Sequence, residues 1–348
     1  MLGVPLSVLD VAPVPRGTTP AQALAQATQL AQRVDALGFT RLWYAEHHNM
    51  PGIASSAPEV LIAHAAALTS RIRVGSGGVM LPNHAPLLVA ERFATLEALH
   101  PGRIDLGIGR APGSDPWTAR ALRRDLGPKA SGHDLPQLLP ELFDYFDPEE
   151  DARIRSTPGA GYRPQVWLLG SSGSSAELAG VLGLHFATAH HFSPAASVPS
   201  MAAYRARFQP SEHLAEPYGL LTVQVVVADT EVEARAAADA FALTFLRMRQ
   251  GIPPSTLPNA EDVAAYPWNA EERAFADAMI DAQAVGTPEQ VRERLTSLVE
   301  ETGASELMAT TMVPDPDVRM RSFELLAGLA ELQSSSASLK SAMAPSRA

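Results

Sequence analysis

Two adjacent histidines, His47 and His48, are the first residues of this chain that suggest chemistry, because they follow a strand-like run at Arg41–Ala45. Adjacent residues of a strand point to opposite faces, so the two rings cannot serve one site together while the strand stays regular. Metal sites more often use His-x-His or His-Glu-x-x-His, and the chain contains neither pattern. A packing histidine and a metal ligand are the alternatives, but the position favours one histidine that donates or accepts a proton near neutral pH.

A second candidate is the glycine-rich segment Gly75-Ser76-Gly77-Gly78, which lies near the end of the next strand-like run. It is not a dinucleotide fingerprint of the type Gly-x-Gly-x-x-Gly, because Met80 occupies the last glycine position. Glycines weaken a strand unless another group approaches the backbone closely. Gly77 and Gly78 therefore predict either a flat ring system against the backbone or a bulge in a tightly curved sheet.

Two further segments together predict an anion site. Arg110 ends a strand-like run, and alone it could simply pair with a loop carboxylate such as Asp115. The segment Gly170-Ser171-Ser172-Gly173-Ser174 joins a buried strand to a helix. Alone it could be an ordinary capped turn, since Ser174 has the spacing of a capping box. A guanidinium, several hydroxyls and a helix N-terminus together favour a phosphate ligand.

Strand and helix signals alternate along the chain, and the candidate residues fall at the ends of strands. Eight strands are expected, at Leu6–Leu9, Arg41–Ala45, Ile72–Val79, Ile104–Ile108, Gln165–Leu169, His185–Ala189, Leu220–Ala228 and Glu306–Met312. Eight helices alternate with them, and capping boxes such as Thr19 with Gln22 mark several helix starts. Strict alternation favours an α/β fold of the (β/α)8 (TIM) barrel type, whose active sites lie at the carboxyl ends of the strands.

Two long irregular stretches interrupt this alternation, at about residues 111–163 after the fourth strand and 251–285 after the seventh. Long loops inside compact domains usually serve a function, so both are interpreted as insertions. We expect a single barrel domain over residues 1–332 and a disordered tail, rich in Ser and Ala, over residues 333–348.

Composition narrows the class of protein. The 348 residues include 46% hydrophobic residues, no cysteine and a formal net charge of −11. The lack of cysteine excludes disulfides, thiolate catalysis and iron–sulfur ligation. A net negative charge without a cluster of Lys and Arg residues argues against nucleic acid as a partner. No apolar run is long enough to span a membrane. No secretory signal is evident, so a cytoplasmic protein is expected.

The helix predicted at Ala57–Thr69 has few polar side chains: beyond Glu59, only His64 and Thr69. One side of an outer barrel helix packs on the strands, and the other side normally meets solvent. An apolar outer side needs a cover, which either the irregular stretches or a second subunit could supply. We favour a homodimer through this helix, with Ala63 and Ala67 at the contact.

Four segments, taken in order, resemble the bacterial luciferase-like family of flavin-dependent monooxygenases, over nearly the whole chain from Leu6 to about Leu332. They are Ala45-Glu46-His47-His48-Asn49-Met50, Gly77-Gly78-Val79-Met80-Leu81-Pro82-Asn83-His84, Pro101–Asp115 and Leu168-Leu169-Gly170-Ser171-Ser172. The resemblance is closest to the branch described simply as luciferase-like monooxygenase. It implies the same barrel fold and reduced flavin mononucleotide (FMN) as the cofactor.

The resemblance also implies roles for individual residues. His47 matches the active-site histidine that assists flavin-peroxide chemistry, and Gly77-Gly78 matches a non-prolyl cis peptide behind the flavin ring. Arg110, Ser171 and Ser174 match phosphate contacts. Gly170 stands where members of the luciferase branch proper carry a glutamate, so the phosphate shell departs from theirs at this position.

The implied function is oxygenation of a small organic substrate, such as an aldehyde or ketone, by reduced FMN and O₂. Because the chain shows no nicotinamide fingerprint, a separate flavin reductase is expected to supply the reduced FMN. Two alternatives stay open: a deazaflavin-dependent dehydrogenase, which shares the barrel but transfers hydride without O₂, and a non-catalytic flavin-binding protein. No metal site is expected.

Overall fold

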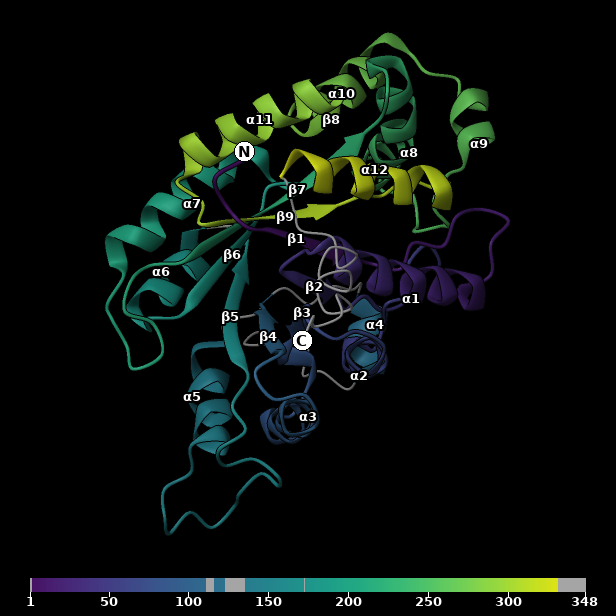
Figure 1. The fold of residues 1–348 in the computed structure, drawn as a ribbon. Helices are drawn as coiled ribbons and strands as arrows, with labels where there is room; N and C mark the ends of the chain where they lie inside the picture. The colour runs from purple at the N-terminus through teal and green to yellow at the C-terminus, as the bar shows by residue number, and fades with distance from the viewer. Residues whose placement is uncertain (1, 111–115, 123–134, 172, 331–348) are drawn as a thin grey trace, which may run out of the picture.

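Parallel strands that alternate with helices close into a barrel in the computed structural model (Figure 1). The structure describes residues 2–110, 116–122, 135–171 and 173–330. The barrel strands are β1 (Leu6–Asp10), β2 (Arg41–Tyr44), β3 (Arg73–Met80), β4 (Ile104–Gly109), β5 (Gln165–Gly170), β6 (His185–Ala189), β7 (Gly219–Val227) and β9 (Glu306–Thr310). Neighbours pair in this order, and β9 pairs with both β7 and β1, which closes the sheet. The predicted (β/α)8 barrel is confirmed.

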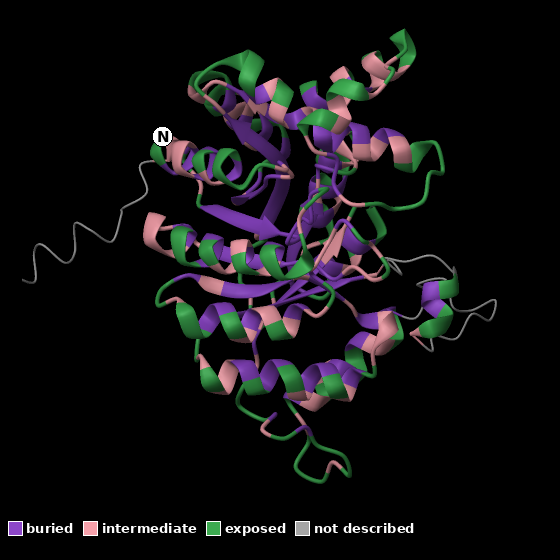
Figure 2. Cartoon of the chain, turned by 90° about the vertical axis from the view of Figure 1, so that its right-hand side faces the viewer, coloured by how far each residue is buried: buried purple, intermediate pink, exposed green. Residues whose placement is uncertain are grey.

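Helices surround the barrel, with one face buried against it and the other exposed (Figure 2). They are α1 (Pro20–Leu37), α2 (Pro58–Leu68), α3 (Pro86–Leu99), α6 (Gly173–Val181), α7 (Pro194–Arg207), α8 (Glu231–Arg249), α11 (Pro288–Thr302) and α12 (Pro316–Leu329), and the short 3₁₀ turn η1 (Leu81–Asn83) precedes α3. The capping box predicted at Thr19 is present, with both hydrogen bonds to Gln22. No helix in the described ranges is long and apolar enough to cross a membrane.

Both insertions contain secondary structure in their described parts. The first holds α4 (Pro116–Ala121) and α5 (Leu135–Phe146), and the second holds α9 (Ala260–Ala265), α10 (Ala270–Asp281) and β8 (Ala284–Gly286). The prediction of an irregular stretch over 251–285 is therefore wrong, and the count of eight strands is one too few. Tertiary packing makes this segment regular. Ala276 and Ile280 of α10 join an apolar cluster with α8, and β8 pairs with the carboxyl end of β7. Asp115 and the tail at 333–348 lie outside the described residues.

Charged and polar side chains close the amino ends of the barrel strands. Arg41, the first residue of β2, donates hydrogen bonds to Asp105 of β4 at 2.9 Å and to Glu306 of β9 at 3.0 Å. Arg73 donates to the second carboxylate oxygen of Asp105 at 2.6 Å, and the hydroxyl of Tyr218 donates to Glu306 at 2.8 Å. Asp105 and Glu306 are fully buried. Pairing within this network, the polar base of the barrel, neutralises charges that cannot reach solvent.

An apolar cluster fills the barrel beyond the polar base. Its buried members are Leu9, Val11, Trp43, Ala45, Trp167, Ala187, Leu220 and Met308. Two glycines of β3 face closely packed neighbours. A Cβ atom on Gly75 would lie 2.5 Å from Asp105 Cβ and 2.9 Å from Trp43 Nε1, and one on Gly77 would lie 2.8 Å from Leu9 Cδ1 and 3.1 Å from Trp43 Cβ. The distances below 3.0 Å are too short for a carbon contact, so a side chain at either position requires its neighbours to shift.

Candidate active site

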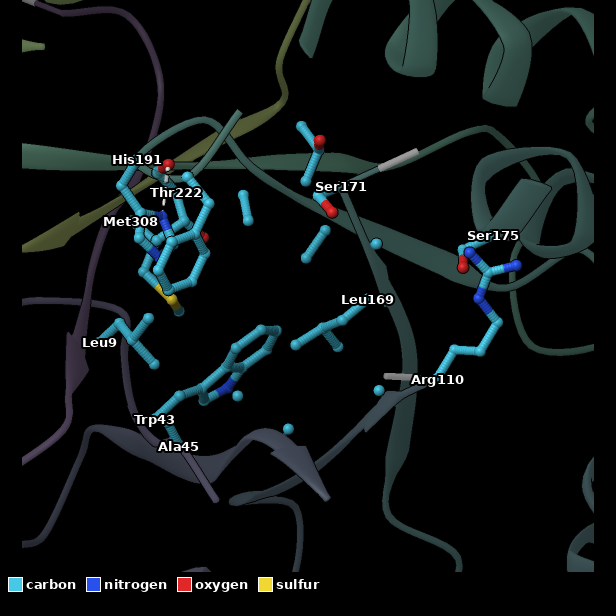
Figure 3. A pocket seen from close by; sticks show the side chains of 18 of the residues that line it. Leu9, Trp43, Ala45, Arg110, Leu169, Ser171, Ser175, His191, Thr222 and Met308 are labelled. Carbon is cyan, nitrogen blue, oxygen red and sulfur yellow. Dashed lines mark hydrogen bonds between the residues drawn. The ribbon is translucent and has the colours of Figure 1, made fainter. Parts of the chain in front are cut away.

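A pocket opens at the carboxyl ends of the strands, where a barrel of this kind places its chemistry. Its lining residues come from strand ends around the whole barrel: Leu9, Val11, Trp43, Ala45, His47, Gly77, Gly78, Met80, Gly109, Arg110, Leu169, Gly170, Ser171, Ser175, Ala187, Thr188, Ala189, His191, Phe192, Thr222 and Met308. Figure 3 shows Arg110 and Ser175 at one end and His191 and Met308 at the other, with Trp43 between them. One end of the pocket therefore carries a cationic side chain, and the other combines apolar side chains with His191.

His47 lines the pocket, as predicted for one of the two adjacent histidines. Its backbone N–H donates to the carbonyl of Ser55 at 3.0 Å, and its Nδ1 atom is buried without a hydrogen-bond partner among the described residues. Burial lowers the pKa of His47, and the nearby charge of Glu46 only partly opposes this effect. The ring is therefore neutral at pH 7, with one nitrogen that can donate a proton and one that can accept.

His48 turns away from the pocket and binds the neighbouring carboxylate. Its Nε2 lies 2.8 Å from Glu46 Oε1, and the Nε2 of His84 lies 2.9 Å from the same oxygen. The backbone N–H of Met80 donates to Glu46 Oε2 at 2.9 Å. Burial raises the pKa of Glu46, but these hydrogen bonds from His84, His48 and Met80 outweigh it and hold the pKa below its usual range. Glu46 thus stays ionised and ties the loop that carries His47 to the end of β3.

The backbone at Gly77 and Gly78 is irregular, as the glycine cluster predicts. The peptide bond between them is cis, and the register of β3 against β4 shifts between Gly77 and Val79. The prediction of a cis peptide or a bulge is confirmed. Close neighbours account for both glycines: a Cβ atom on Gly77 would lie 2.8 Å from Leu9 Cδ1, and one on Gly78 would lie 2.7 Å from the carbonyl oxygen of Gly107. Contact with a flavin ring stays a prediction.

The two segments predicted to form an anion site meet at one end of the pocket. Arg110 Nη1 donates to Ser174 Oγ at 2.7 Å. Helix α6 begins at Gly173, so Ser174 lies in its first turn and not at the N-cap, which disfavours the alternative of a turn capped by Ser174. Ser175 lies beside Arg110 (Figure 3), and Gly170 and Ser171 also line the pocket, whereas Ser174 is not among its lining residues. A guanidinium, hydroxyls and the N–H groups of a helix start are the donors that bind phosphate.

His191 and Phe192 belong to the pocket and were not singled out from the sequence. His191 is buried, and its Nδ1–H donates to the carbonyl of Thr222 at 3.2 Å. Burial lowers the pKa of His191 to about 4, although the carbonyl of Thr222 opposes the shift. The signal was present in the sequence: His190-His191 follows a predicted strand just as His47-His48 does. The described residues contain no group of three or more acidic, histidine or cysteine side chains that could hold a metal.

The chain is similar to known proteins over most of its length. Residues 5–306 match the family model described as luciferase-like monooxygenase. The protein YvbT of Bacillus subtilis (strain 168) is 48% identical over 324 residues, which cover 92% of this chain and 95% of YvbT. The luciferase-like monooxygenase of Escherichia coli (strain K12) is 41% identical over 323 residues, which cover 92% of this chain and 96% of that protein.

Solved structures are also similar. The crystal structure of apo-MsnO8 superposes with a TM-score of 0.87 at 40% identity, over 96% of this chain and 100% of the other. The oxygenating constituent of 3,6-diketocamphane monooxygenase of Pseudomonas putida, in complex with FMN, has a TM-score of 0.70 at 21% identity and covers 93% of this chain and 96% of its own. An F420-dependent secondary alcohol dehydrogenase has a TM-score of 0.65 at 15% identity and covers 92% of this chain and 97% of its own. The last two likenesses show the fold alone.

Proposed function

Because this chain belongs to the luciferase-like monooxygenase family, a family of oxidoreductases, we propose that it is the oxygenase of a two-component flavin-dependent system. Reduced FMN and O₂ would be the co-substrates, and a separate flavin reductase would supply the reduced FMN. The organic substrate would be a small, uncharged carbonyl compound, an aldehyde or a ketone.

The observation that carries this proposal is the arrangement of the pocket. Arg110 and Ser174 are hydrogen-bonded at the start of α6, Ser175 lies beside Arg110, and Ser171 also lines the pocket (Figure 3). This donor set fits a phosphate monoester. The pocket also offers apolar walls, including Leu9, and the backbone of Gly77 and Gly78 without side chains. These surfaces fit a flat ring, so the residues present fit FMN.

The roles of the residues follow from this placement. Arg110 and the serines would bind the phosphate and fix the orientation of the ring. The apolar walls would exclude water, which strengthens each polar interaction inside the pocket. Bound reduced FMN would supply the electrons for activation of O₂. His47, neutral and held by its neighbour Glu46, would donate or accept one proton at a ring nitrogen during oxygen transfer.

Two other functions compete with this one, as the sequence already left open. The structural likeness to an F420-dependent dehydrogenase extends over the barrel, so a deazaflavin could use the same phosphate end. The FMN complex of the diketocamphane monooxygenase constituent has the same fold, so the fold is compatible with FMN as well, and the titration below decides between the two cofactors. A non-catalytic flavin-binding protein would have no use for a neutral histidine in the pocket, which favours an enzyme.

The test begins with the mass of any cofactor that co-purifies with the protein, followed by titration with FMN and with F420. O₂ uptake is then measured with chemically reduced FMN and a panel of aldehydes and ketones. Binding of FMN with substrate-dependent O₂ uptake supports the proposal. Tight binding of F420 and hydride transfer without O₂ would replace it with the dehydrogenase, and FMN binding without turnover would leave a binding protein.

The proposal includes a homodimer through α2. In the structure Val60 of this helix is 64% exposed and Leu68 is 43% exposed, and Ala67 is also exposed. Ala63 is half-buried, so it contributes less to the outer face than the sequence suggested. Leu88 and Leu99 of the neighbouring α3 are exposed as well. These apolar side chains support a contact between two copies that includes both helices.

A further inference from the structure

We propose that Trp43, Trp167 and Tyr218 form a relay that carries single electrons from the polar base of the barrel to the pocket. This inference rests on the proposed flavin site, because the oxidant would be a photoexcited oxidised flavin or an oxygen radical formed there. The relay would reduce such species before they attack oxidisable side chains in the pocket, such as Met308 and His47.

The three rings form a continuous path along the barrel interior. Trp43 lines the pocket, and its ring extends between the two ends (Figure 3). The ring centroids of Trp43 and Trp167 are 5.1 Å apart, and those of Trp167 and Tyr218 are 5.8 Å apart. Both pairs meet edge to face, at distances typical of aromatic rings in contact. Electron transfer slows steeply with distance, so contacts of this kind permit rapid steps between neighbouring rings.

Charges of the polar base lie beside both tryptophans. The indole N–H of Trp43 donates to the buried carboxylate of Asp105 at 2.9 Å, and a nearby negative charge stabilises an oxidised, positively charged ring. Arg41 lies over Trp167 at 4.7 Å and has the opposite effect there. Because Asp105 is paired with Arg41 and Arg73, and Arg41 is paired with Glu306 as well, both effects are largely offset, so the step from Trp167 to Trp43 depends on the ring contact and on the final donor, Tyr218.

Tyr218 is suited to be the final electron donor. A phenol that loses an electron becomes a strong acid, so its oxidation requires a proton acceptor within hydrogen-bond reach. The hydroxyl of Tyr218 already donates to Glu306 Oε2 at 2.8 Å. Tyr218 is also partly exposed at the base of the barrel, where a small reductant from solution can restore it.

The net step balances in electrons and protons. The oxidant in the pocket gains one electron from Trp43, Trp43 is restored by Trp167, and Trp167 is restored by Tyr218. Tyr218 loses one electron, and its phenolic proton moves to the Glu306 carboxylate, which leaves a neutral tyrosyl radical. A reductant such as a small thiolate in solution then returns the electron and becomes a thiyl radical, and the proton moves back from Glu306 to the phenolate of Tyr218.

The competing explanation is that the rings only fill the space that Gly75 and Gly77 leave free. A spectroscopic experiment separates the two. FMN binding is first measured by fluorescence titration, and the FMN-loaded protein is then illuminated with blue light without oxygen and frozen for electron paramagnetic resonance. We expect a tyrosyl radical in the wild type. Incorporation of ring-deuterated tyrosine should narrow its spectrum, which identifies the radical without any substitution.

Variants then assign the path. Trp167→Phe keeps an aromatic ring that is much harder to oxidise, and it should abolish the tyrosyl signal. Tyr218→Phe removes only a hydroxyl and should leave a tryptophanyl radical in its place. Trp268→Phe is the matched control, because Trp268 packs on Tyr266 in the second insertion, and it should leave the tyrosyl signal unchanged.

Three results would overturn the relay: FMN-loaded wild type without a protein radical, a tyrosyl signal that survives Tyr218→Phe, or one that survives Trp167→Phe. If Trp167→Phe does not fold, the labelled wild type and Tyr218→Phe decide. A wild type that binds no FMN would overturn the proposed function and the relay with it, whereas FMN binding without a radical would overturn the relay alone.

Discussion

The carboxylate of Glu46 accepts a hydrogen bond from the backbone N–H of Met80 at 2.9 Å, and this bond joins the two loops that frame the pocket. Glu46 immediately precedes His47, and Met80 is two residues beyond the cis peptide at Gly77-Gly78. The placement of the proposed proton-transfer residue and of the proposed ring-binding backbone therefore depends on one buried carboxylate. His48 and His84 bind the same carboxylate and complete the tie.

Glu46→Gln should destabilise the protein and loosen the pocket. The amide keeps the shape of the side chain but loses the charge that accepts from His48, His84 and Met80, so we expect a loss of about 1.5–3 kcal/mol in the free energy of unfolding. Urea denaturation measures this change. Glu324→Gln is the control, because Glu324 pairs with Arg33 at the surface and should change stability by less than about 1 kcal/mol. Equal effects of the two substitutions would contradict the role given to Glu46.

Arg110→Ala should weaken FMN binding by about 1.5–3 kcal/mol, the range for a hydrogen bond to a charged group. Arg110→Lys should recover part of the loss, since it keeps the charge but not the planar fork. Fluorescence titration gives both affinities. Arg292→Ala, on the exposed face of α11, is the control and should bind FMN like the wild type. If Arg110→Ala also binds FMN with unchanged affinity, the phosphate does not lie at this end of the pocket.

His47→Ala should reduce product formation by about 10²–10⁴-fold, the usual contribution of a positioned general acid or base. FMN affinity should stay close to that of the wild type, because the proposed phosphate contacts are at the other end of the pocket. Product yield and FMN titration are measured on the same preparations, with the exposed His213→Ala as control. Unchanged product yield in His47→Ala would remove His47 from the chemistry.

Stability should fall as the pH is lowered from about 6.5 toward 4. Burial holds the pKa of His191 at about 4, and burial does the same to His185. Unfolding releases these rings to their ordinary pKa of about 6.5, so the unfolded state binds protons in this window and acid favours it. His191 alone should contribute roughly 3 kcal/mol of this loss by pH 4.

His191→Asn tests this contribution, because its amide can still donate to the carbonyl of Thr222. The free energy of unfolding of the variant should depend less steeply on pH between 6.5 and 4 than that of the wild type. Urea denaturation across this range gives both slopes. Parallel curves for the two proteins would show that His191 is not held neutral by the fold.

Ala67→Glu should dissociate the proposed homodimer. The substitution would place one carboxylate from each subunit in an apolar contact that offers no positively charged partner. Like charges brought together at an interface cost several kcal/mol. Sedimentation velocity at micromolar concentration measures the oligomeric state of the wild type and of each variant. Val232→Glu, on the exposed face of α8 and equally charged, is the control and should stay dimeric. A monomeric wild type would contradict the dimer outright.

The barrel could be predicted from the sequence because its signals are local. Strand runs, capping boxes such as Thr19 with Gln22, and glycine stops each depend on residues within one turn or strand. His47 and Arg110 could be proposed as neighbours of one pocket, since strand ends share a face in this fold. β8 was missed because three residues of strand have no pattern of their own and form only through pairing with β7.

Contacts between distant residues were beyond sequence reasoning. Nothing local shows that His84 binds Glu46, 38 residues earlier, or that Ser174 accepts from Arg110 instead of capping its helix. Gly77 and Gly78 were interpreted as a surface for a flat ring or as a bulge, and the structure shows that Leu9 and the backbone of Gly107 also approach them closely. Such assignments depend on register and barrel closure, which are properties of the whole chain.

The polar base of the barrel has a consequence for how the chain acquires its structure. Arg41 lies in the second strand, and its partner Glu306 lies in the last, so the pair joins residues 265 positions apart in the chain. A growing polypeptide that has not yet reached Glu306 holds Arg41 without one of its two carboxylates. The final strand therefore both closes the sheet and completes the neutralisation of charge at its base. We therefore expect an amino-terminal fragment that stops short of β9 to have an open sheet and an incompletely paired Arg41, and not to fold as a smaller version of the same barrel.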